Sequence, residues 1–520
     1  MPKVNLSNIQ HVYFIGIGGI GMSALARYFL HNGIQVSGYD KVETLLTQHL
    51  ISEGANIHYK VDLTRFSSEE VEAKTIIYKG LENKELRNEE TNNEITNNEE
   101  TNNEELDSKE STSKALRSKE SGKESNSLHN LDLVIYTPAI PKDHKELSWF
   151  QKSKIPVLKR SVVLGLLSKK KRCVAVAGTH GKTSTSALIG HILKDCDHSP
   201  TAFVGGIMKN YNSNLILGDS NWVIVEADEY DRSFLQLSPE ILILMSLDPD
   251  HLDIYGDFEQ MVAAYEELCL QIKKRGKLVV HNSVMRKLSK SLIKKLTKNK
   301  IQIFIIGLAQ DVEYSNINIR DHHFYFDYRI GNLTIDDILS VMPGNHNVIN
   351  ATGAITAAHL VGVNGLQIKL ALSQFKGIKR RFETVYESNS FVLIDDYAHH
   401  PEELKAAIGT ARLLYPNRRI SAIFQPHLYT RTRDFYQEFA TVLDGLDELY
   451  LLPVYPAREE PIPGVNSQMI LNIMKNNNGY IVELQQLIHK LHENKPDVLM
   501  TLGASDIDRF HGDIMDAVLK

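Results

Sequence analysis

A glycine-rich segment near residue 180 has the residue types of a phosphate-binding loop. Residues 177–184 read AGTHGKTS, directly after an apolar run and before a helical pattern. The loop is a shortened variant, because Val176 stands where the longer Walker motif has its first glycine. Backbone amides around Gly181 would wrap a triphosphate, Lys182 would neutralise the phosphates, and the Thr183 hydroxyl is placed to ligate magnesium. The segment therefore predicts a nucleoside triphosphate site.

Two acidic clusters follow the next two apolar runs along the chain. The first, residues 226–231, reads EADEYD after the run 222–225, and the second, residues 248–251, reads DPDH after the run 241–246. Sites of α/β proteins lie at the carboxyl ends of their strands, so both clusters are expected beside the phosphate loop. Carboxylates there can hold magnesium beside the phosphates, and the histidine can add a nitrogen ligand. This placement favours a metal-assisted site over two solvated loops.

A second glycine-rich segment lies near the start of the chain. Residues 16–21 read GIGGIG, which fits GxGxxG, and Asp40 ends the β-rich run that comes next. Glycines at these positions let backbone amides approach a phosphate at a helix N-terminus. Taken alone, the motif favours NAD with Asp40 on the ribose, but any nucleotide diphosphate can use the same cradle. A tight turn with a purely structural role is the alternative.

The segments around these motifs alternate between strand and helix patterns, which is typical of α/β folds. Helical patterns cover 22–32 and 402–414. The predicted strands fall into three successive groups: 11–17, 35–40 and 131–136; 173–177, 222–225, 241–246, 277–281 and 301–306; and 391–394, 420–424, 448–452 and 497–502. We therefore predict an α/β fold of three consecutive α/β domains with mostly parallel sheets, over residues 1–167, 168–375 and 376–520.

The segment 82–130 interrupts the first of these domains. It repeats TNNE three times and SKE twice, and it contains no aromatic residue. Such a segment cannot offset its ordering entropy by burying apolar surface. We expect a disordered insertion. The alternative, an exposed charged helix, is disfavoured because Asn, Thr and Ser are poor helix formers.

The amino-acid composition limits the kinds of molecule that this protein is expected to bind. The 520 residues include 58 basic and 64 acidic side chains, for a net charge of -6, so the basic footprint of a nucleic-acid-binding protein is missing. Cys173, Cys196 and Cys269 stand at no metal-ligand spacing, which argues against a disulfide framework or a thiolate zinc site. No run reaches the roughly 18 apolar residues that span a membrane. We expect a cytoplasmic monomer or homodimer with small-molecule partners, and neither nucleic acid nor membrane.

Taken together, the motifs resemble those of the Mur ligases of peptidoglycan synthesis, over nearly the whole chain except the insertion. The matching segments, in chain order, are HVYFIGIGGIGMSALA, AGTHGKTST, EADEYDRSFLQLSP, DPDHLDIYG, GNHNVINATGA, GIKRRFE, DDYAHHP, FQPHLYTRTRDF and PIPGVNS. The resemblance implies a Rossmann-like N-terminal domain that binds the UDP of a sugar substrate and a central ATPase domain. A Rossmann-like C-terminal domain would close over ATP and the amino acid. The first glycine loop is thereby reassigned from NAD to a UDP-sugar.

The resemblance also implies site residues, position by position. The UDP-sugar would be bound by Gly16, Gly18, Gly19, Gly21, Met22, Ser23 and Asp40. ATP would be bound by Gly178, Thr179, His180, Gly181, Lys182, Thr183, Ser184, His346, Asn347, Asn350, Arg381 and Asp396. The amino acid would be received by Tyr397, His399, His400, His427 and Arg431. Thr183, Glu226 and His251 would hold Mg²⁺, and Lys182, Glu226 and His251 would be catalytic.

The implied reaction is an ATP-dependent ligation that joins L-alanine to the lactyl carboxylate of UDP-N-acetylmuramate. A carboxylate is a poor acyl donor because oxide is a bad leaving group, so phosphoryl transfer from ATP would form an acyl phosphate that the alanine amine attacks. His400 and His251 are candidates for accepting the amine's proton. Met245 and Ser246 depart from the family's TN pair, and Leu428 replaces an arginine, which leaves Arg431 as the expected partner of the amino acid's carboxylate.

Three other interpretations stay open at this point. The nearest is a sister ligase that attaches a whole peptide to the same sugar nucleotide, since it would share the N-terminal and ATP motifs. A remote one is an NAD-dependent dehydrogenase, although a nicotinamide cofactor has no need of the second phosphate loop. The third is a catalytically inactive sensor of cell-wall precursors. The intact catalytic and metal-binding candidates argue against it: Lys182, Thr183, Glu226 and His251.

Overall fold

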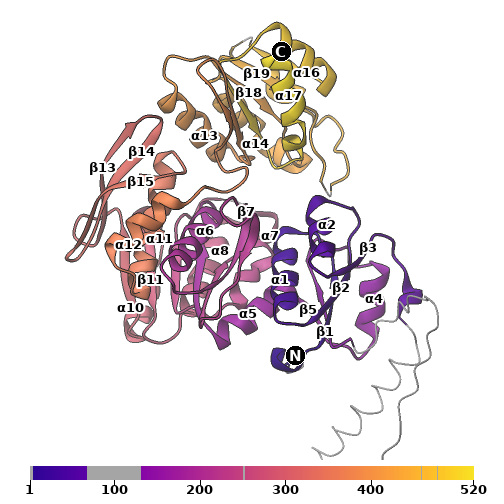
Figure 1. The fold of residues 1–520 in the computed structure, drawn as a ribbon, viewed down its shortest axis with the longest axis vertical. Coiled ribbons are helices and arrows are strands. Elements are labelled where there is room, and N and C mark those ends of the chain that lie inside the picture. Colours follow the sequence, from indigo (N-terminus) through magenta and orange to yellow (C-terminus); the bar gives the residue numbers. More distant parts are fainter. Residues whose placement is uncertain (1–3, 67–130, 250–251, 458, 477) are drawn as a thin grey trace, which may run out of the picture. The chain divides into compact units, whose positions relative to one another are not determined.

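The computed structural model describes residues 4–66, 131–249, 252–457, 459–476 and 478–520 (Figure 1). The chain forms two compact units, one within residues 1–22 and 29–159 and the other within residues 23–28 and 160–520. The predicted insertion at 82–130 and the predicted ligand His251 both lie outside the described residues.

The first unit is built on a five-stranded sheet whose neighbouring strands are all parallel (Figure 1). The strands are β1 (His11–Ile15), β2 (Gln35–Tyr39), β3 (Asn56–His58), β4 (Leu133–Tyr136) and β5 (Val157–Lys159), in the order β3-β2-β1-β4-β5. The helices are α1 (Ile20–His31), of which residues 23–28 belong to the second unit, α2 (Leu45–Ser52) and α4 (Lys145–Lys152). Two short 3-10 turns are η1 (Leu6–Asn8) and η2 (Leu63–Arg65). Because β4 pairs with β1, the chain on both sides of residues 82–130 belongs to one sheet.

The second unit begins with a ten-stranded sheet in the order β15-β14-β13-β12-β11-β10-β6-β9-β7-β8. Its strands are β6 (Arg172–Ala177), β7 (Thr201–Met208), β8 (Ser213–Ile216), β9 (Trp222–Glu226), β10 (Ile241–Leu244), β11 (Lys277–His281), β12 (Gln302–Ile306), β13 (Val312–Arg320), β14 (His323–Ile330) and β15 (Leu333–Ser340). The run from β13 to β7 is parallel, whereas β8 at one end and the strands β14 and β15 of the β13–β15 meander at the other are antiparallel to their neighbours. The strands that neighbour β6 are buried apolar runs, as expected for a parallel sheet covered on both faces.

Helices connect the strands of this sheet and cover it. They are α5 (Arg160–Lys170), α6 (Lys182–Asp195), α7 (Leu252–Tyr255), α8 (Phe258–Leu270), α9 (Asn282–Met285), α10 (Lys290–Lys298), α11 (Asn345–Val361) and α12 (Gly365–Gln374), with the 3-10 turn η3 (Tyr230–Gln236) after β9. Both α6 and α11 are buried along most of their length, so they pack inside the domain rather than on its surface.

The same unit continues with a six-stranded sheet in the order β16-β17-β21-β18-β19-β20. Its strands are β16 (Glu383–Glu387), β17 (Val392–Asp396), β18 (Ile420–Phe424), β19 (Glu448–Leu451), β20 (Gly479–Ile481) and β21 (Val498–Leu502). Its helices are α13 (Pro401–Leu414), α14 (Tyr429–Leu443), α15 (Gln468–Leu471), α16 (Leu484–Glu493) and α17 (His511–Leu519), with the turn η4 (Ile507–Phe510). The sheet is parallel except for the edge strand β16.

The predicted fold class is confirmed: three α/β sheets with mostly parallel strands follow one another along the chain. Every predicted strand is present within one or two residues, whereas β3, β5, β7, β8, β13–β15, β16 and β20 are additional. The first strand ends at Ile15 rather than at residue 17, because Gly16 turns the backbone with φ of +84°. The division into domains at residues 167 and 375 stays a prediction.

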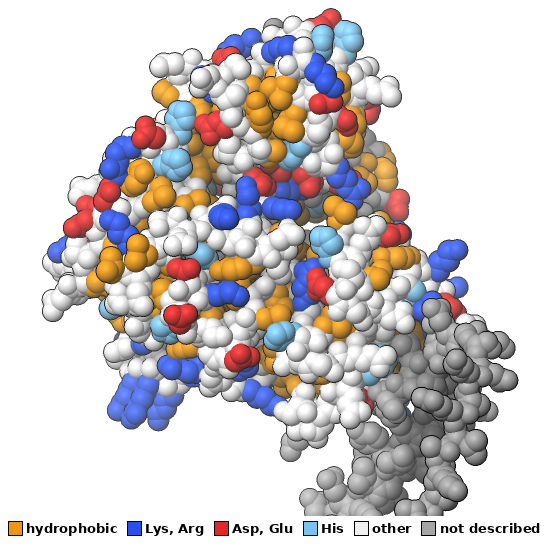
Figure 2. Space-filling view, in the orientation of Figure 1, with side chains coloured by type: hydrophobic (Ala, Val, Ile, Leu, Met, Phe, Trp, Pro, Cys, Tyr) orange, Lys and Arg blue, Asp and Glu red, His pale blue; other side chains and the backbone are white. Residues whose placement is uncertain are grey.

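Two further sequence expectations concern the surface and the thiols. Basic, acidic and hydrophobic side chains are interspersed on the face shown in Figure 2, in keeping with the small net charge of -6. Cys173, Cys196 and Cys269 are all buried free thiols. No helix among the described residues has the length and apolar character required to cross a membrane.

Candidate active site

The phosphate-loop segment lies between β6 and α6, as the sequence predicts. β6 ends at Ala177 and α6 begins at Lys182, so residues 178–181 form the turn between them. Gly178 and Gly181 have φ of +133° and +82°, a backbone region that residues with a Cβ rarely adopt. A phosphate at the N-terminus of α6 would meet backbone N–H groups and the positive end of the helix dipole. The local structure is therefore that of an anion site.

Ser246, after β10, holds this loop in place. Its Oγ accepts a hydrogen bond from the backbone N–H of His180 at 2.7 Å and donates to the carbonyl of His180 at 3.1 Å. The hydroxyls of Ser246 and Thr179 lie 3.0 Å apart, and Thr179 Oγ1 also accepts from the backbone N–H of Asp248 at 3.1 Å. A Cβ on Gly178 would lie 2.9 Å from the Ser246 nitrogen. The residue that departs from the family pattern thus supports the phosphate loop directly.

Two asparagines that were predicted on the adenine side lie behind the loop. A Cβ on Gly181 would overlap Oδ1 of Asn350, so the asparagine packs directly against the loop. Asn350 Nδ2 donates to Asn347 Oδ1 at 3.0 Å, and Asn347 Nδ2 donates to the carbonyl of Pro343 at 2.8 Å. Both asparagines are buried at the start of α11. The hydrogen bonds fix Asn350 within α11, and Asn350 in turn packs against the loop at Gly181.

Thr183 and Glu226 lie together at the carboxyl ends of β6 and β9. Thr183 Oγ1 donates to Glu226 Oε2 at 3.2 Å. The other oxygen, Oε1, accepts from Ser186 Oγ at 3.0 Å and from the backbone N–H of Gly205 at 2.5 Å. A hydroxyl and a carboxylate are hard oxygen donors of the kind that Mg²⁺ prefers. The structure therefore brings two of the three predicted metal ligands together, while the third, His251, lies outside the described residues.

Lys182 is folded back onto its own loop. Its Nζ donates to the carbonyls of Gly178 and Thr179 at 2.7 and 3.3 Å and to Glu229 Oε1 at 2.8 Å. Burial alone would lower the pKa of Lys182, but the adjacent Glu229 carboxylate raises it above its usual value. The side chain therefore carries a full positive charge beside the expected phosphate position.

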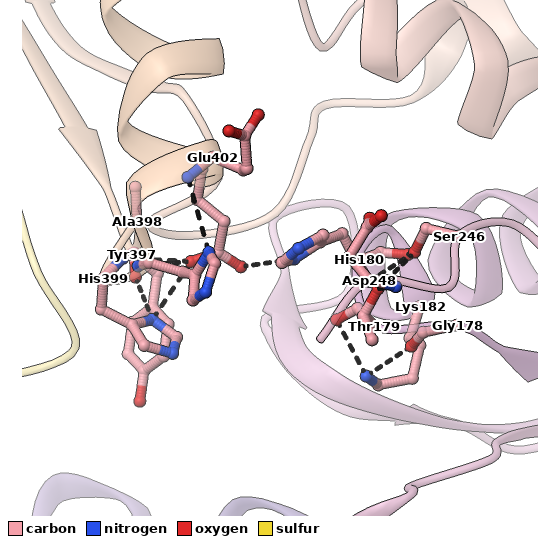
Figure 3. A network of polar contacts seen from close by, with 12 residues as sticks. Gly178, Thr179, His180, Lys182, Ser246, Asp248, Tyr397, Ala398, His399 and Glu402 are labelled. Carbon is pink, nitrogen blue, oxygen red and sulfur yellow. Dashed lines mark hydrogen bonds and ion pairs between the residues drawn. The ribbon is translucent and has the colours of Figure 1, made fainter. Parts of the chain in front are cut away.

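Glu403, on the first turn of α13, joins two of the predicted regions. Figure 3 shows these regions, with His180 of the phosphate loop on one side and Tyr397 and His399 on the other. Glu403 Oε1 lies 3.3 Å from Nδ1 of His180 in the phosphate loop. Its Oε2 accepts from the backbone N–H groups of His399 and His400 at 3.1 and 3.3 Å. Burial alone would raise the pKa of Glu403, but His399 and His180 hold it well below its usual range. Glu403 is thus a charged anchor between the phosphate loop and the predicted amino-acid region.

The residues predicted to receive the amino acid lie near Glu403, and most of them have aromatic or imidazole rings. The His400 ring lies 5.6 Å from that of His180, and the His399 ring lies 5.5 Å from that of Tyr397 and 6.0 Å from that of His427. Burial lowers the pKa of His399, and the positive charges of Arg431 and Arg381 lower it further. The structure therefore brings all five of these residues into one region: Tyr397, His399, His400, His427 and Arg431.

Leu428, the second departure from the family pattern, has a strained backbone. Its φ of +70° is unusual for a residue that has a Cβ, and it lies at the N-cap of α14, directly before the turn that carries Arg431. The backbone N–H of Leu428 donates to the carbonyl of Tyr455 at 2.9 Å, and its own carbonyl accepts from Thr432 Oγ1 at 2.8 Å. Strained residues of this kind cluster at functional sites.

The linker before the last sheet carries Arg380 and Arg381. Residues 377–379 are bonded to β7: the Lys379 N–H donates to the carbonyl of Ile207 at 2.9 Å, and the Gly377 carbonyl accepts at 3.0 Å from Lys209. From Arg380 onward, the linker is bonded to the six-stranded sheet instead. The Arg380 guanidinium donates to Asp395 Oδ2 at 3.1 Å and to the carbonyl of Gly503 at 2.7 Å.

Asp396 and Arg381, predicted to bind ATP, lie next to that ion pair. Asp396 accepts from the backbone N–H groups of Phe382 and Ala398 at 2.7 and 2.8 Å. Burial raises the pKa of Asp396 to about 6, although Arg381 opposes the shift. Burial also lowers the pKa of His346 to about 4, with Arg381 contributing in the same direction. Arg381 therefore lies close enough to both His346 and Asp396 to influence their pKa values.

In the first unit, the predicted UDP-sugar loop follows β1. Gly16 has φ of +84°, and the backbone N–H of Gly18 donates to Asp40 Oδ2 at 2.7 Å. A Cβ on Gly18 would lie 2.7 Å from the Thr47 methyl group, so no larger residue fits there. Asp40, first considered as a ribose ligand, thus holds the loop itself.

The remaining residues of this predicted set lie at the start of α1. Gly19 precedes the helix, Gly21 and Met22 are in its first turn, and Met22 is buried. Ser23 is fully buried as well, and its Oγ accepts from Asn214 Nδ2 at 3.0 Å. Their role toward a UDP-sugar stays a prediction.

Sequence reasoning missed three residues of the site. Glu229, Ser246 and Glu403 contact the phosphate loop from sequence distances of 47, 66 and 223 residues. The only sequence indication was their position in or beside matched motifs, which did not specify what each side chain contacts.

Comparison with known proteins places this geometry in a family. Three family models match: the Mur ligase family catalytic domain over residues 11–94, the Mur ligase middle domain over residues 176–358, and the Mur ligase glutamate ligase domain over residues 380–505. The chain is 40% identical over 511 residues to a protein of Cytophaga hutchinsonii named UDP-N-acetylmuramate--L-alanine ligase, covering 98% of this chain and 96% of that relative. A protein of the same name from Flavobacterium psychrophilum is 40% identical over 506 residues, with 97% of each chain covered. The chain therefore belongs to the Mur ligase family.

Solved structures agree with this assignment. The UDP-N-acetylmuramate-alanine ligase of Thermotoga maritima matches with a TM-score of 0.70 and 25% identity, over 98% of both chains. A murein peptide ligase of Psychrobacter arcticus matches with a TM-score of 0.63 and 20% identity, also over 98% of both chains, and shares the fold.

Proposed function

We propose that the protein is an ATP-dependent ligase that joins L-alanine to the lactyl carboxylate of UDP-N-acetylmuramate in peptidoglycan precursor synthesis. The observation that carries the proposal is the placement of Lys182, Thr183 and Glu226 around one phosphate loop. This arrangement occurs in a chain whose relatives of nearly equal length are named for that reaction.

On the ATP side, the residues have separate tasks. Lys182 binds the phosphates and stabilises the charge that develops on the transferring phosphoryl group. Thr183 and Glu226, with His251, would hold Mg²⁺, which would neutralise phosphate charge when bound. Among the described residues, which omit His251, no group of three or more His, Cys, Asp or Glu side chains is gathered as a metal site. The metal proposal therefore rests on Thr183 and Glu226. His346, Arg381 and Asp396 bind the nucleoside part.

On the acceptor side, phosphoryl transfer to the lactyl carboxylate gives an acyl phosphate. The neutral amine of L-alanine attacks the acyl carbon, and phosphate leaves. Arg431 binds the amino acid's carboxylate, because a guanidinium matches a carboxylate with two parallel hydrogen bonds. His400 and His251 are the candidates for accepting the amine's proton. The glycine loop at residues 16–21 binds the UDP-sugar in the first unit, and the reaction takes place in the cytoplasm.

The test is phosphate release by the purified protein with ATP, Mg²⁺, UDP-N-acetylmuramate and a panel of acceptors. We expect L-alanine to give the fastest release, glycine and L-serine slower release, and D-glutamate or a tripeptide none. Faster release with a tripeptide would establish the sister ligase instead. No release with any acceptor, together with an absorbance change on adding NAD, would establish a dehydrogenase.

A further inference from the structure

The ammonium group of Lys182 has no donor left for a phosphate. A lysine ammonium has three N–H groups. In the structure, these meet three acceptors, the carbonyls of Gly178 and Thr179 at 2.7 and 3.3 Å and Glu229 Oε1 at 2.8 Å. An incoming phosphate oxygen must therefore replace at least one of them.

Of these three acceptors, only Glu229 carries a charge. The pair is largely removed from water, since the Lys182 side chain is 17% exposed and that of Glu229 is 3% exposed. Two other carboxylates lie near Lys182 but are bound elsewhere: Glu226 by Thr183 and Ser186, and Asp228 by Arg160 at 3.1 Å. Glu229 is therefore the group that neutralises the loop lysine directly.

The backbone fixes Glu229 in this position. The hydroxyl of Tyr255 donates to the Glu229 carbonyl at 2.6 Å, and the Arg232 guanidinium lies 5.4 Å from the Tyr255 ring centre. Asp231 and Arg232 follow with φ of +55° and +52°. Two successive residues in this region cost about 1–3 kcal/mol each, and such strain persists only where surrounding contacts impose it. The backbone conformation after β9 therefore places the Glu229 side chain against the phosphate loop.

We propose that Glu229 is a positioning residue that holds Lys182 until ATP arrives, and that binding exchanges the Glu229 carboxylate for a phosphate oxygen on the lysine. The exchange rests on the proposed ATP-dependent function. Glu229 thereby competes with the nucleotide: it keeps the buried ammonium neutralised in the free protein, and it weakens ATP binding by the free energy of the pair that must be broken. No bond is made or broken in this step other than hydrogen bonds.

The first test is direct binding of Mg²⁺–ATP to the full-length protein without the other substrates. Glu229→Gln keeps the shape and an acceptor oxygen but removes the charge, so we expect about tenfold tighter binding, equivalent to about 1.4 kcal/mol. KM for ATP should fall with it, while kcat should not rise. Glu240→Gln is the matched control, because Glu240 forms a 2.6 Å ion pair with Arg172 at the opposite end of β6. The control should bind ATP like the unmodified protein.

A damaged fold would not bind ATP more tightly. Tighter ATP binding by Glu229→Gln would therefore show that Glu229 competes with ATP and does not merely support the fold. Equal or weaker binding by folded Glu229→Gln, in a protein whose unmodified form binds ATP, would overturn the inference. Failure of the unmodified protein to bind ATP would instead overturn the proposed function.

The second test needs no nucleotide and covers a Glu229→Gln variant that fails to fold. Lys182→Met leaves Glu229 buried beside an apolar side chain, so its melting temperature should fall. Adding Glu229→Gln to Lys182→Met should recover part of that loss, because the uncompensated charge is gone. If the double variant melts no higher than Lys182→Met, the two side chains are not coupled and the inference fails.

Discussion

His180 of the phosphate loop and Glu403 of α13 face each other with 3.3 Å between Nδ1 and Oε1. His180 lies in the turn after β6 of the ten-stranded sheet and Glu403 on the helix after β17 of the six-stranded sheet, and both side chains are mostly buried. Burial opposes the charge on His180, but Glu403 raises the pKa of His180 above its usual value. The contact therefore links the predicted ATP region and the predicted amino-acid region by a charge that depends on pH.

We expect Glu403→Gln to lower the free energy of unfolding, with an effect that depends on pH. Since the pKa of Glu403 is depressed, its contribution is present above the unfolded carboxyl pKa of about 4.3 and is lost as pH falls through the folded value. Since the pKa of His180 is raised, its contribution is present below about 6.5 and is lost as pH rises through the folded value. The difference from the unmodified protein should thus be largest between these two pH values, at about 1–3 kcal/mol.

Urea unfolding at a series of pH values measures this difference. Glu402→Gln is the control, because its side chain is exposed and next in sequence. A pH-independent difference between Glu403→Gln and the unmodified protein would contradict the ion pair with His180.

We expect Glu226→Gln to raise the Mg²⁺ concentration needed for half-maximal phosphate release by at least about tenfold, since even partners outside the ligand sphere contribute that much to metal affinity. Ser186→Ala removes one hydrogen bond to the same carboxylate but keeps the oxygen donor, so its Mg²⁺ requirement should shift far less. An unchanged Mg²⁺ dependence in Glu226→Gln would remove Glu226 from the metal site.

Ser246→Ala should loosen the phosphate loop. It deprives the His180 N–H of its acceptor, at an expected cost of about 1–3 kcal/mol, and KM for ATP should rise. Hydrogen exchange at the His180 amide reports the change directly and should become faster. Thr297→Ala removes a hydroxyl from the exposed helix α10 and should alter neither quantity. Unchanged exchange at His180 would show that Ser246 does not hold the loop.

Arg431→Ala should raise KM for L-alanine about 10- to 100-fold, because the loss of hydrogen bonds to a charged group weakens binding by about this factor. KM for ATP and KM for UDP-N-acetylmuramate should stay nearly unchanged. Arg433→Ala is the matched control on the same helix, because Arg433 is exposed and paired with Asp434. A parallel rise of all three KM values in Arg431→Ala would indicate a structural role instead.

The sequence predicts those parts of the fold that depend on residues close together in the chain. Strands such as β10 are continuous apolar runs, and Gly178 and Gly181 mark a turn that only glycines allow. Sequence reasoning missed the β13–β15 meander: only β14 alternates regularly between buried and more exposed residues, whereas β13 is mostly exposed and β15 has no regular alternation. Edge additions of this kind depend on pairing with the rest of the sheet.

The candidate site shows the same difference between features with local causes and features that depend on distant parts of the chain. The positions of Lys182, Thr183 and Glu226 follow from motifs at strand ends, and the structure brings them together. Their partners could not be predicted, because a hydrogen bond such as that between His180 and Ser246 depends on the three-dimensional path of the chain rather than on spacing. Ser246 was first noticed only as a departure from the family pattern.

The linker forms a pivot in the second unit, because its hydrogen bonds change from one sheet to the other between two consecutive residues. Lys379 is bonded to β7 of the ten-stranded sheet, whereas the next residue, Arg380, is bonded to Asp395 and Gly503 of the six-stranded sheet. A rotation of one sheet against the other is therefore absorbed by the backbone torsions at this junction, where Arg380 already has φ of +61°. Arg381 follows this junction directly, so any such rotation would shift the arginine that is predicted to bind the nucleotide relative to the phosphate loop.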